Sequence, residues 1–502
     1  SLEVFLATPI SLPVVGKNPM AFTTLVVTAA LVYFLLPHAW RWIWLLASSC
    51  FFFGYFYYST YVSGITPVHY YIIIILSVLS VIIVDYIIAI LIERSKAGSS
   101  NNSKIYLLIG ILFPIVLLFI FKYFNFFNQT ISQIAGFFML NYPAQILNII
   151  VPVGISYYTF HSISYIIDVY RGQKPERHLG IFALYILFFP KIVAGPIERS
   201  GMLIPQFREE HAFDYQRFTD GLKLMAWGLF KKIVIADRAA IIANEVFNNP
   251  HGYQGIYLII ACFSFIFQVY CDFSGYTDIA IGLALILGFR LPVNFNSPYK
   301  AHGIANFWKR WHISLSRWLK DYLYIPMGGN RKGKFRTNLN LMLTMLIGGL
   351  WHGADIRFII WGGLHGLGLI IDKFFSRIFG SRAGTNRFIR PLSVFLTFQF
   401  VSFCWIFFRA VDMDHAGIML SQIFENFMPA SFENIMEVYG TVFSLIAAGY
   451  LIHFLPEKVK ESYRGIFIKI PVPVQMVIIL AVGILLYQMR AYDVLPFIYF
   501  RF

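Results

Sequence analysis

Long apolar stretches recur throughout this chain of 502 residues, and they restrict its fold more than any other feature. A helix needs about 20 apolar residues to cross the hydrocarbon core of a bilayer. Backbone polar groups at that depth must be bonded within the protein, so only helices and closed barrels span it. We therefore expect an all-α polytopic membrane protein of about 10–12 transmembrane helices. The candidate spans are 20–36, 41–58, 68–92, 105–127, 146–169, 218–235, 254–270, 338–350, 357–375, 391–408, 441–455 and 472–489.

Two further segments, 179–195 and 274–290, mix apolar residues with Pro or Gly and polar residues. Such segments are expected to be re-entrant or broken, and to be covered by protein or to line a water-filled cavity. Only 13% of the residues are charged, against roughly 25% in soluble domains. We therefore interpret residues 1–502 as one integral membrane unit without a soluble catalytic domain.

Basic residues predict the orientation of this unit. The formal net charge is +15, which in a soluble protein would suggest a nucleic-acid partner. Here the bases lie largely in short loops between apolar runs, the pattern typical of cytoplasmic loops and anionic lipid headgroups. Arg94, Lys96 and Lys104 assign their loop to the cytoplasm, which puts the N-terminus outside. We expect a multi-pass protein of the cell (inner) membrane that contacts lipids and binds no nucleic acid.

The segment 300–336 has the strongest charge bias, with nine bases against the single acid Asp321. Its apolar residues recur at helical spacing, which predicts an amphipathic helix lying in the cytoplasmic interface. This stripe consists of Phe307, Trp311, Ser314, Leu315, Trp318, Leu319 and Tyr322. The bases have two interpretations. They attract lipid headgroups, or Lys309, Arg310 and Arg317 bind the phosphates of a polyanionic cosubstrate.

Two histidines lie in tryptophan-flanked motifs of this apolar chain. His312 lies in FWKRWHISLSRWLKDYLYIP, and His352 lies in GGLWHGADIRFIIWGGLHG. An ionisable group near the bilayer is a candidate functional residue by default. A neutral imidazole can also act as a general base near neutral pH. The four cysteines lack paired spacing, so we interpret them as buried packing residues and expect neither a disulfide framework nor a metal site.

The two histidine motifs resemble the signature of the membrane-bound O-acyltransferase (MBOAT) family, in particular its polysaccharide O-acetyltransferase branch. The resemblance extends to FFPKIVAGPIERS (188–200), GLFKKIVIADR (228–238), YCDFSGYTDIAIGLALILGFRLPVNFNSPY (270–299) and PFIYFRF (496–502). It covers most of the chain from about residue 150 onward, while the first third is similar mainly in hydropathy.

This resemblance implies a multi-helix fold with an aqueous tunnel, in which an acyl group passes from a donor to a hydroxyl group. The catalytic histidine of the family corresponds to His352, and its second position corresponds to His312. With a thioester donor, His352 as general base and His312 as orienting group or oxyanion donor would suffice, although a covalent intermediate remains open. No tightly bound cofactor is expected, and Trp351 could form a wall of the donor pocket.

The implied donor is acetyl-CoA from the cytoplasm. The implied acceptor is an extracytoplasmic polysaccharide, such as alginate or another exopolysaccharide, or peptidoglycan. An extracytoplasmic partner of the SGNH or alginate-acetylation type would relay the acyl group. The alternative enzyme transfers D-alanine from a carrier protein to teichoic acid. A transporter is the alternative outside enzymes, but it predicts inverted repeats, which the sequence does not show.

Other polar residues have both structural and functional interpretations. His161 could line the tunnel or be a hydrogen-bonded core histidine, and His365 fits packing or hydrogen bonding. Asp272 and Asp278 could line the tunnel, orient a histidine, or pair with nearby Lys or Arg. Asn294, in NFNSPY, is typical of a turn or a helix end.

Overall fold

The computed structural model describes residues 19–459, apart from 63–67, 99–101, 144–145, 148–150, 380–385, 428–431 and 457, with a few more positions between 470 and 484. Every regular element in this part of the chain is a helix, which confirms the predicted all-α class. The main helices are α2 (Pro19–Leu35), α3 (His38–Val62), α4 (Val68–Ala97), α5 (Ser103–Leu118), α6 (Phe124–Phe137), α7 (Ile155–Tyr170), α8 (Leu179–Leu187), α10 (Tyr215–Leu229), α11 (Asp237–Asn248), α12 (Ile256–Leu287), α15 (Gly333–His352), α16 (Ile356–Phe379), α18 (Ile389–Arg409), α19 (Met413–Phe424) and α20 (Phe432–Phe454).

Five helical segments of the described residues are long and apolar enough to cross a membrane. They are Tyr70–Ala97, Ser103–Phe137, Ile256–Leu287, Ile356–Ile378 and Ile389–Arg409. Two shorter apolar helices, Thr24–Leu35 and Val442–Phe454, coincide with predicted spans, whereas most of the predicted span 472–489 lies outside the described residues. The polytopic architecture is therefore confirmed, and the total of 10–12 spans stays a prediction.

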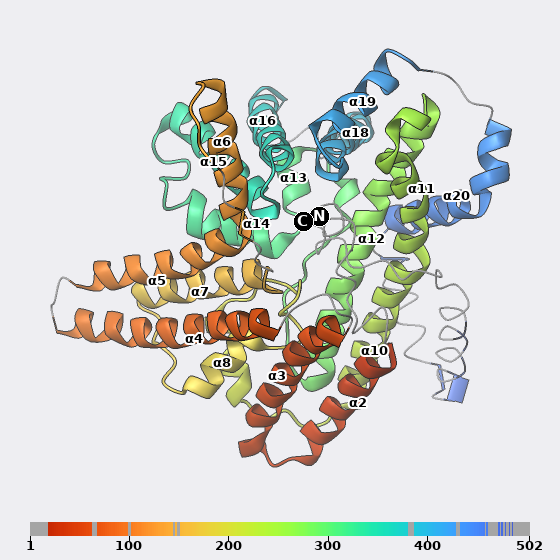
Figure 1. Cartoon of the computed structure of the whole chain (residues 1–502). Coiled ribbons are helices and arrows are strands. Elements are labelled where there is room, and N and C mark those ends of the chain that lie inside the picture. Colours follow the sequence, from red (N-terminus) through yellow and green to blue (C-terminus); the bar gives the residue numbers. More distant parts are fainter. Residues whose placement is uncertain are drawn as a thin grey trace.

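The helices form groups of neighbours, two of which are linked by α12. Helices α4, α5 and α7 run side by side, and α10 and α11 both pack along α12 (Figure 1). Helix α15 packs against α16, which in turn contacts α18. Because α12 also contacts α18, α19 and α20, it links α10 and α11 to the group that contains α18.

Helix α12 corrects one prediction. Its 32 residues form one continuous helix that includes most of 274–290, the segment expected to be re-entrant or broken. The glycines that suggested a break instead allow close packing. A Cβ atom on Gly275 would lie 2.7 Å from the carbonyl oxygen of Gly228 in α10, and one on Gly282 would lie 2.5 Å from that of Gly221. Small residues of this kind let membrane helices approach closely. By contrast, 179–195 is broken as predicted, because α8 ends at Leu187 and a turn follows.

The segment 300–336 also differs from its prediction. It contains two short helices, α13 (Ile304–Trp308) and α14 (Ile313–Leu319), followed by the π-helical turn η7 (Lys320–Tyr324), rather than one amphipathic helix. Its apolar stripe packs largely into the protein core, since Trp311 and Leu315 are each 1% exposed. The interruption between α13 and α14 places His312 immediately before α14.

Helices α15 and α16 approach each other through the glycines of GGLWHG and WGGLHG. A Cβ atom on Gly349 would lie 2.2 Å from the carbonyl oxygen of Phe358, and one on Gly362 would lie 2.3 Å from that of Met345. Small residues at such positions let membrane helices approach closely. One cysteine prediction is wrong, because Cys50 is exposed, while Cys262, Cys271 and Cys404 are buried.

Candidate active site

The two predicted histidines both lie close to one indole ring. The ring centroid of Trp351 is 6.3 Å from that of His312 and 4.8 Å from that of His352. His312 has no exposed surface, and His352 is 5% exposed. The fold therefore brings together residues 40 positions apart in the sequence, from the start of α14 and the end of α15.

Aromatic rings surround both imidazoles. The His352 ring lies 5.1 Å from Trp361 and 5.4 Å from Phe408, each in an edge-on arrangement. The His312 ring lies 4.7 Å from Phe273 of α12. Such surroundings exclude water and strengthen the electrostatic interactions of any charge that develops there.

The backbone of His312 has an uncommon conformation. Its φ of 43° and ψ of 55° fall in the left-handed region, which costs on the order of 1–3 kcal/mol for a residue with a side chain. This left-handed turn separates α13 from α14. It directs the His312 imidazole into the core at the start of α14. Strain of this kind concentrates at functional sites.

Asn294 determines which nitrogen of His312 carries a proton. The Asn294 Oδ1 atom lies 3.1 Å from the backbone nitrogen of Ser314 and 2.9 Å from the Ser314 hydroxyl. A backbone N–H only donates, so the atom that faces it must be the amide oxygen. The His312 Nδ1 atom lies 3.2 Å from this same oxygen and must therefore donate to it. Neutral His312 consequently has Nδ1 protonated and Nε2 as an acceptor.

The charge state of His312 fits this assignment. His312 lies outside the five candidate spans, and burial lowers its pKa from its ordinary value to about 3. The ring is therefore neutral at physiological pH. A neutral imidazole can accept a proton or a hydrogen bond through Nε2, whereas an imidazolium cannot.

The predicted donor-binding residues differ in exposure. Lys309 and Arg317 are exposed, and Trp351 is buried close to both histidines. Arg310 is half-buried, and it donates hydrogen bonds to the Asn306 side chain and to the Asn296 carbonyl group. Burial and the neighbouring Arg390 guanidinium lower the pKa of Arg310.

Most of the remaining polar residues have structural roles. Asp272 forms an ion pair with Lys232 at 2.6 Å, and Asp278 forms one with Lys231 at 2.7 Å. This confirms the predicted pairing of both aspartates.

His161 and His365 are also core residues. His161 is 1% exposed and accepts a hydrogen bond from the backbone nitrogen of Glu198, which supports a core role. His365 is fully buried and packs edge-on against Trp361 at 4.8 Å.

Two contributions to the site were missed by the sequence interpretation. Asn294 was interpreted as a turn or helix-end residue, and its amide oxygen does accept from the first turn of α14, but its bond to His312 was not foreseen. Lys122 was treated as part of an apolar span, yet its amino group contacts the backbone of His352. A lysine within an apolar run is itself a signal of function, and that signal was present in FIFKYFNFF.

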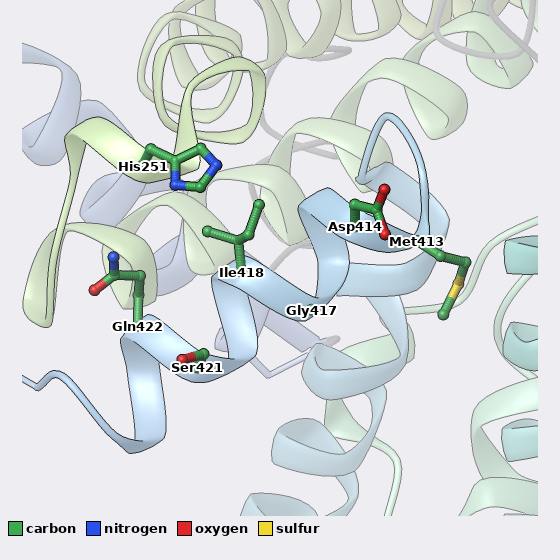
Figure 2. A pocket seen from close by; sticks show the side chains of 7 residues that line it. All are labelled: His251, Met413, Asp414, Gly417, Ile418, Ser421 and Gln422. Atoms are coloured by element: carbon green, nitrogen blue, oxygen red, sulfur yellow. The ribbon is translucent and has the colours of Figure 1, made fainter.

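Two hollows among the described residues are lined by neither His312 nor His352. One, of about 460 Å³, is lined by His251 and by residues of α19, including Asp414 and Gln422 (Figure 2). The other, of about 1230 Å³, is an apolar groove between α18 and α20. Lys300, Arg387 and Arg390 add positive charge to this groove, and Arg390 is the neighbour of Arg310.

Comparisons with a family model and with individual proteins point to the same family. The model of the membrane-bound O-acyltransferase family matches residues 178–409, a range that includes both histidines. The chain is 43% identical over 321 residues to a probable alginate O-acetylase of Pseudomonas aeruginosa, covering 64% of this chain and 60% of that protein. It is 36% identical over 362 residues to a peptidoglycan O-acetyltransferase of Helicobacter pylori, covering 67% of each.

A more distant similarity links the chain to a teichoic acid D-alanyltransferase of Bacillus subtilis. The two are 30% identical over 291 residues, covering 53% of this chain and 71% of that protein. The chain spans less than two thirds of the length of the alginate O-acetylases that it matches, with shares of 60–64% for the proteins of P. aeruginosa and Pseudomonas putida.

Proposed function

Because this chain belongs to the membrane-bound O-acyltransferase family, we propose that it moves an acetyl group from cytoplasmic acetyl-CoA for O-acetylation of an extracytoplasmic polysaccharide. The observation that carries the proposal is the pair of buried histidines that both contact the ring of Trp351, within the range matched by the family. The protein would act in the inner membrane of the cell as a multi-pass enzyme.

In this proposal His352 is the general base. It removes the proton of the acceptor hydroxyl group as the oxygen attacks the thioester carbonyl carbon. The tetrahedral intermediate then collapses, the carbon–sulfur bond breaks, and the CoA thiolate takes up a proton. The thioester is already activated, so this transfer needs no redox change. General-base catalysis typically contributes about 10²–10⁴-fold to the rate.

The geometry of His312 favours one of its two suggested roles. A neutral ring whose Nδ1 donates to Asn294 has no second N–H with which to stabilise an oxyanion. We therefore propose that His312 orients the reacting groups by accepting a hydrogen bond at Nε2.

The donor would approach from the basic face of the protein. Lys309, Arg310 and Arg317, with Trp351 next to the base, are the proposed donor contacts. The positive charge that Arg390 adds beside Arg310 supports an anionic donor. Lys and Arg form strong, charge-assisted hydrogen bonds with phosphate groups.

The acceptor and the partner are proposed from the relatives. Two of them are named for alginate and peptidoglycan, so either polymer, or another exopolysaccharide, is a candidate acceptor. An extracytoplasmic protein of the SGNH or alginate-acetylation type would receive the acetyl group and pass it to the polymer. The second candidate function is D-alanyl transfer from a carrier protein, which the similarity to a teichoic acid D-alanyltransferase favours.

Purified protein supplied with acetyl-CoA labelled in its acetyl group tests the proposal, with a soluble polysaccharide or the partner protein as acceptor. His352→Ala should reduce transfer by about 10²–10⁴-fold, the range for loss of a general base. His312→Ala should be severely impaired but retain residual turnover. His453→Gln is the matched control, because His453 is buried in α20 and its Nε2 accepts a hydrogen bond from the backbone nitrogen of Tyr299.

Near-normal turnover by His352→Ala would refute the proposed mechanism. Transfer from a D-alanyl carrier, but not from acetyl-CoA, would establish the second candidate function. Solute flux through reconstituted protein without any acyl transfer would instead indicate a transporter.

A further inference from the structure

The end of α15, which carries His352, is bonded to two consecutive residues of a distant membrane helix. Lys122 and Tyr123 belong to the span Ser103–Phe137, outside the range 178–409 that the family model matches. We propose that Lys122 is a positioning residue that fixes the C-terminal end of α15 and thereby the imidazole of His352. The inference rests on the proposed role of His352 as general base.

The contacts are all to backbone carbonyl groups. The Lys122 amino group donates hydrogen bonds to the carbonyl oxygens of Trp351 and His352, each at 2.9 Å. The Tyr123 hydroxyl group lies 3.0 Å from the carbonyl oxygen of Leu350 and 3.3 Å from that of Trp351. The last four carbonyl groups of a helix have no partner within the helix. Three of these four groups in α15 are thus bonded by side chains of another helix.

A local distortion presents these two side chains together. Residues Phe119–Tyr123 form a π-helical turn, η2, between α5 and α6. In a regular α-helix consecutive side chains point about 100° apart, which hinders both from reaching one helix end. Single π-helical turns occur frequently at functional sites.

The chemistry of Lys122 also points to this role. A lysine at membrane depth is costly and is normally retained for function. A cation at a helix C-terminus interacts favourably with the helix dipole. Lys122 bonds backbone oxygens, so it contacts no reacting atom of the proposed mechanism.

His352 is the last residue of α15, and Gly353 continues in extended conformation. Without Lys122, the last turn of α15 would lose two of its external hydrogen bonds. A displacement of about 1 Å at a catalytic group can reduce the rate by about 10²-fold. Three of the proposed donor contacts, Lys309, Arg310 and Arg317, lie on other elements, and only Trp351 shares the end of α15. Loss of Lys122 should therefore affect kcat more than the apparent KM for the donor.

The test compares three variants of the full-length protein in the acetyl-CoA assay. Lys122→Met removes the hydrogen-bond donors at similar length, and Lys122→Arg restores them. Asn125→Leu is the control, because Asn125 lies one turn along the same span but bonds only the backbone of Leu147, at 2.9 Å for each of its two bonds. Thermal unfolding in detergent measures how far each variant is destabilised.

We expect Lys122→Met to lower kcat by about 10–10²-fold with little change in KM, in line with displacement of a catalytic group. Lys122→Arg should regain most of kcat. Asn125→Leu should keep the wild-type kcat even where its unfolding midpoint falls by as much as that of Lys122→Met. A wild-type kcat for Lys122→Met, an equal loss in Asn125→Leu, or a change confined to KM would each overturn the inference.

Including His352→Ala in the same assay separates the two failures. Turnover by His352→Ala would refute the proposed function of His352. If His352→Ala is inactive while Lys122→Met is as active as the wild type, only the positioning role of Lys122 fails.

Discussion

Replacing Asn294 with leucine should impair catalysis through His312. The Asn294 side chain is fully buried, and its oxygen accepts from the Ser314 backbone, the Ser314 hydroxyl and His312 Nδ1. Leucine has similar size but no acceptor. The Ser314 hydroxyl keeps a second contact, because it accepts from the backbone nitrogen of Ile197 at 3.1 Å.

Two donors of fixed direction would then be left without an acceptor, namely the Ser314 N–H and the His312 Nδ1–H. Each buried unsatisfied donor costs roughly 1–3 kcal/mol, so Asn294→Leu should lose about 2–6 kcal/mol of stability. His312 would also be free to exchange its tautomer and its ring orientation. A misplacement of this kind should lower kcat by about 10²-fold.

Asn294→Asp separates the two effects. A carboxylate keeps an acceptor for all three donors, but it favours the charged imidazolium form of His312. Burial holds the pKa of wild-type His312 at about 3, so its ring stays neutral as the pH falls from 8 to 6. The carboxylate should raise that pKa, and kcat of the variant should therefore fall toward the acidic end of this range.

The assay is labelled acetyl transfer at several pH values, combined with thermal unfolding in detergent. A stable Asn294→Leu variant with wild-type kcat would refute the claim that Asn294 sets the tautomer of His312. The same conclusion would follow if Asn294→Asp and the wild type had identical pH profiles.

Two further predictions concern the donor face and the helix pair that carries His352. Neutralising Lys309, Arg310 and Arg317 together should raise the apparent KM for acetyl-CoA. This increase should shrink at high salt, because exposed charges are screened over about 10 Å at 0.1 M. Lower expression with an unchanged KM would instead indicate that the bases anchor the protein to lipid headgroups. Gly362→Ala should destabilise the protein by about 1–3 kcal/mol through overpacking and lower turnover, since its Cβ would lie 2.3 Å from the Met345 carbonyl oxygen. Gly363→Ala is the matched control, because the nearest atom to its Cβ would be a Leu346 methyl carbon at 3.5 Å, and equal unfolding midpoints for the two variants would contradict the packing argument.

The membrane class could be predicted from sequence because apolar length is a direct physical requirement of the bilayer. The packing of α15 against α16 was also predictable, since glycines in two consecutive apolar segments indicate close helix contact. Whether a helix is continuous was harder to predict from the sequence. Gly275 and Gly282 suggested a broken segment, yet both lie within α12 and contact α10. A glycine that interrupts a helix and one that admits a neighbour have the same local sequence pattern.

The helix predicted from Phe307 to Tyr322 was wrong for a related reason. Its spacing is helical because its apolar residues are buried, but the backbone leaves the helix at His312 with a φ of 43°. Histidine gives little warning of such a turn, and the acceptors that stabilise it come from Asn294, 18 positions earlier. Periodicity reports which side chains are buried, and it does not report whether the chain that carries them is continuous.

This break has a consequence for how the candidate site is built. In a continuous helix, the backbone N–H of Ser314 would bond a carbonyl group four residues earlier, and Asn294 could not accept from it. The left-handed turn instead lets the Asn294 side-chain oxygen bond His312 Nδ1 and the backbone N–H of Ser314, in the first turn of α14, at once. One buried amide thus caps a helix and selects a tautomer. The second histidine obtains its position differently, from a helix end held by Lys122 and Tyr123. The two supports come from different elements, but Trp351 contacts both imidazole rings and its carbonyl group accepts a hydrogen bond from Lys122. The effects of Asn294→Leu and Lys122→Met on the activation free energy should therefore deviate from additivity, as expected of residues that share a partner and act in one reaction.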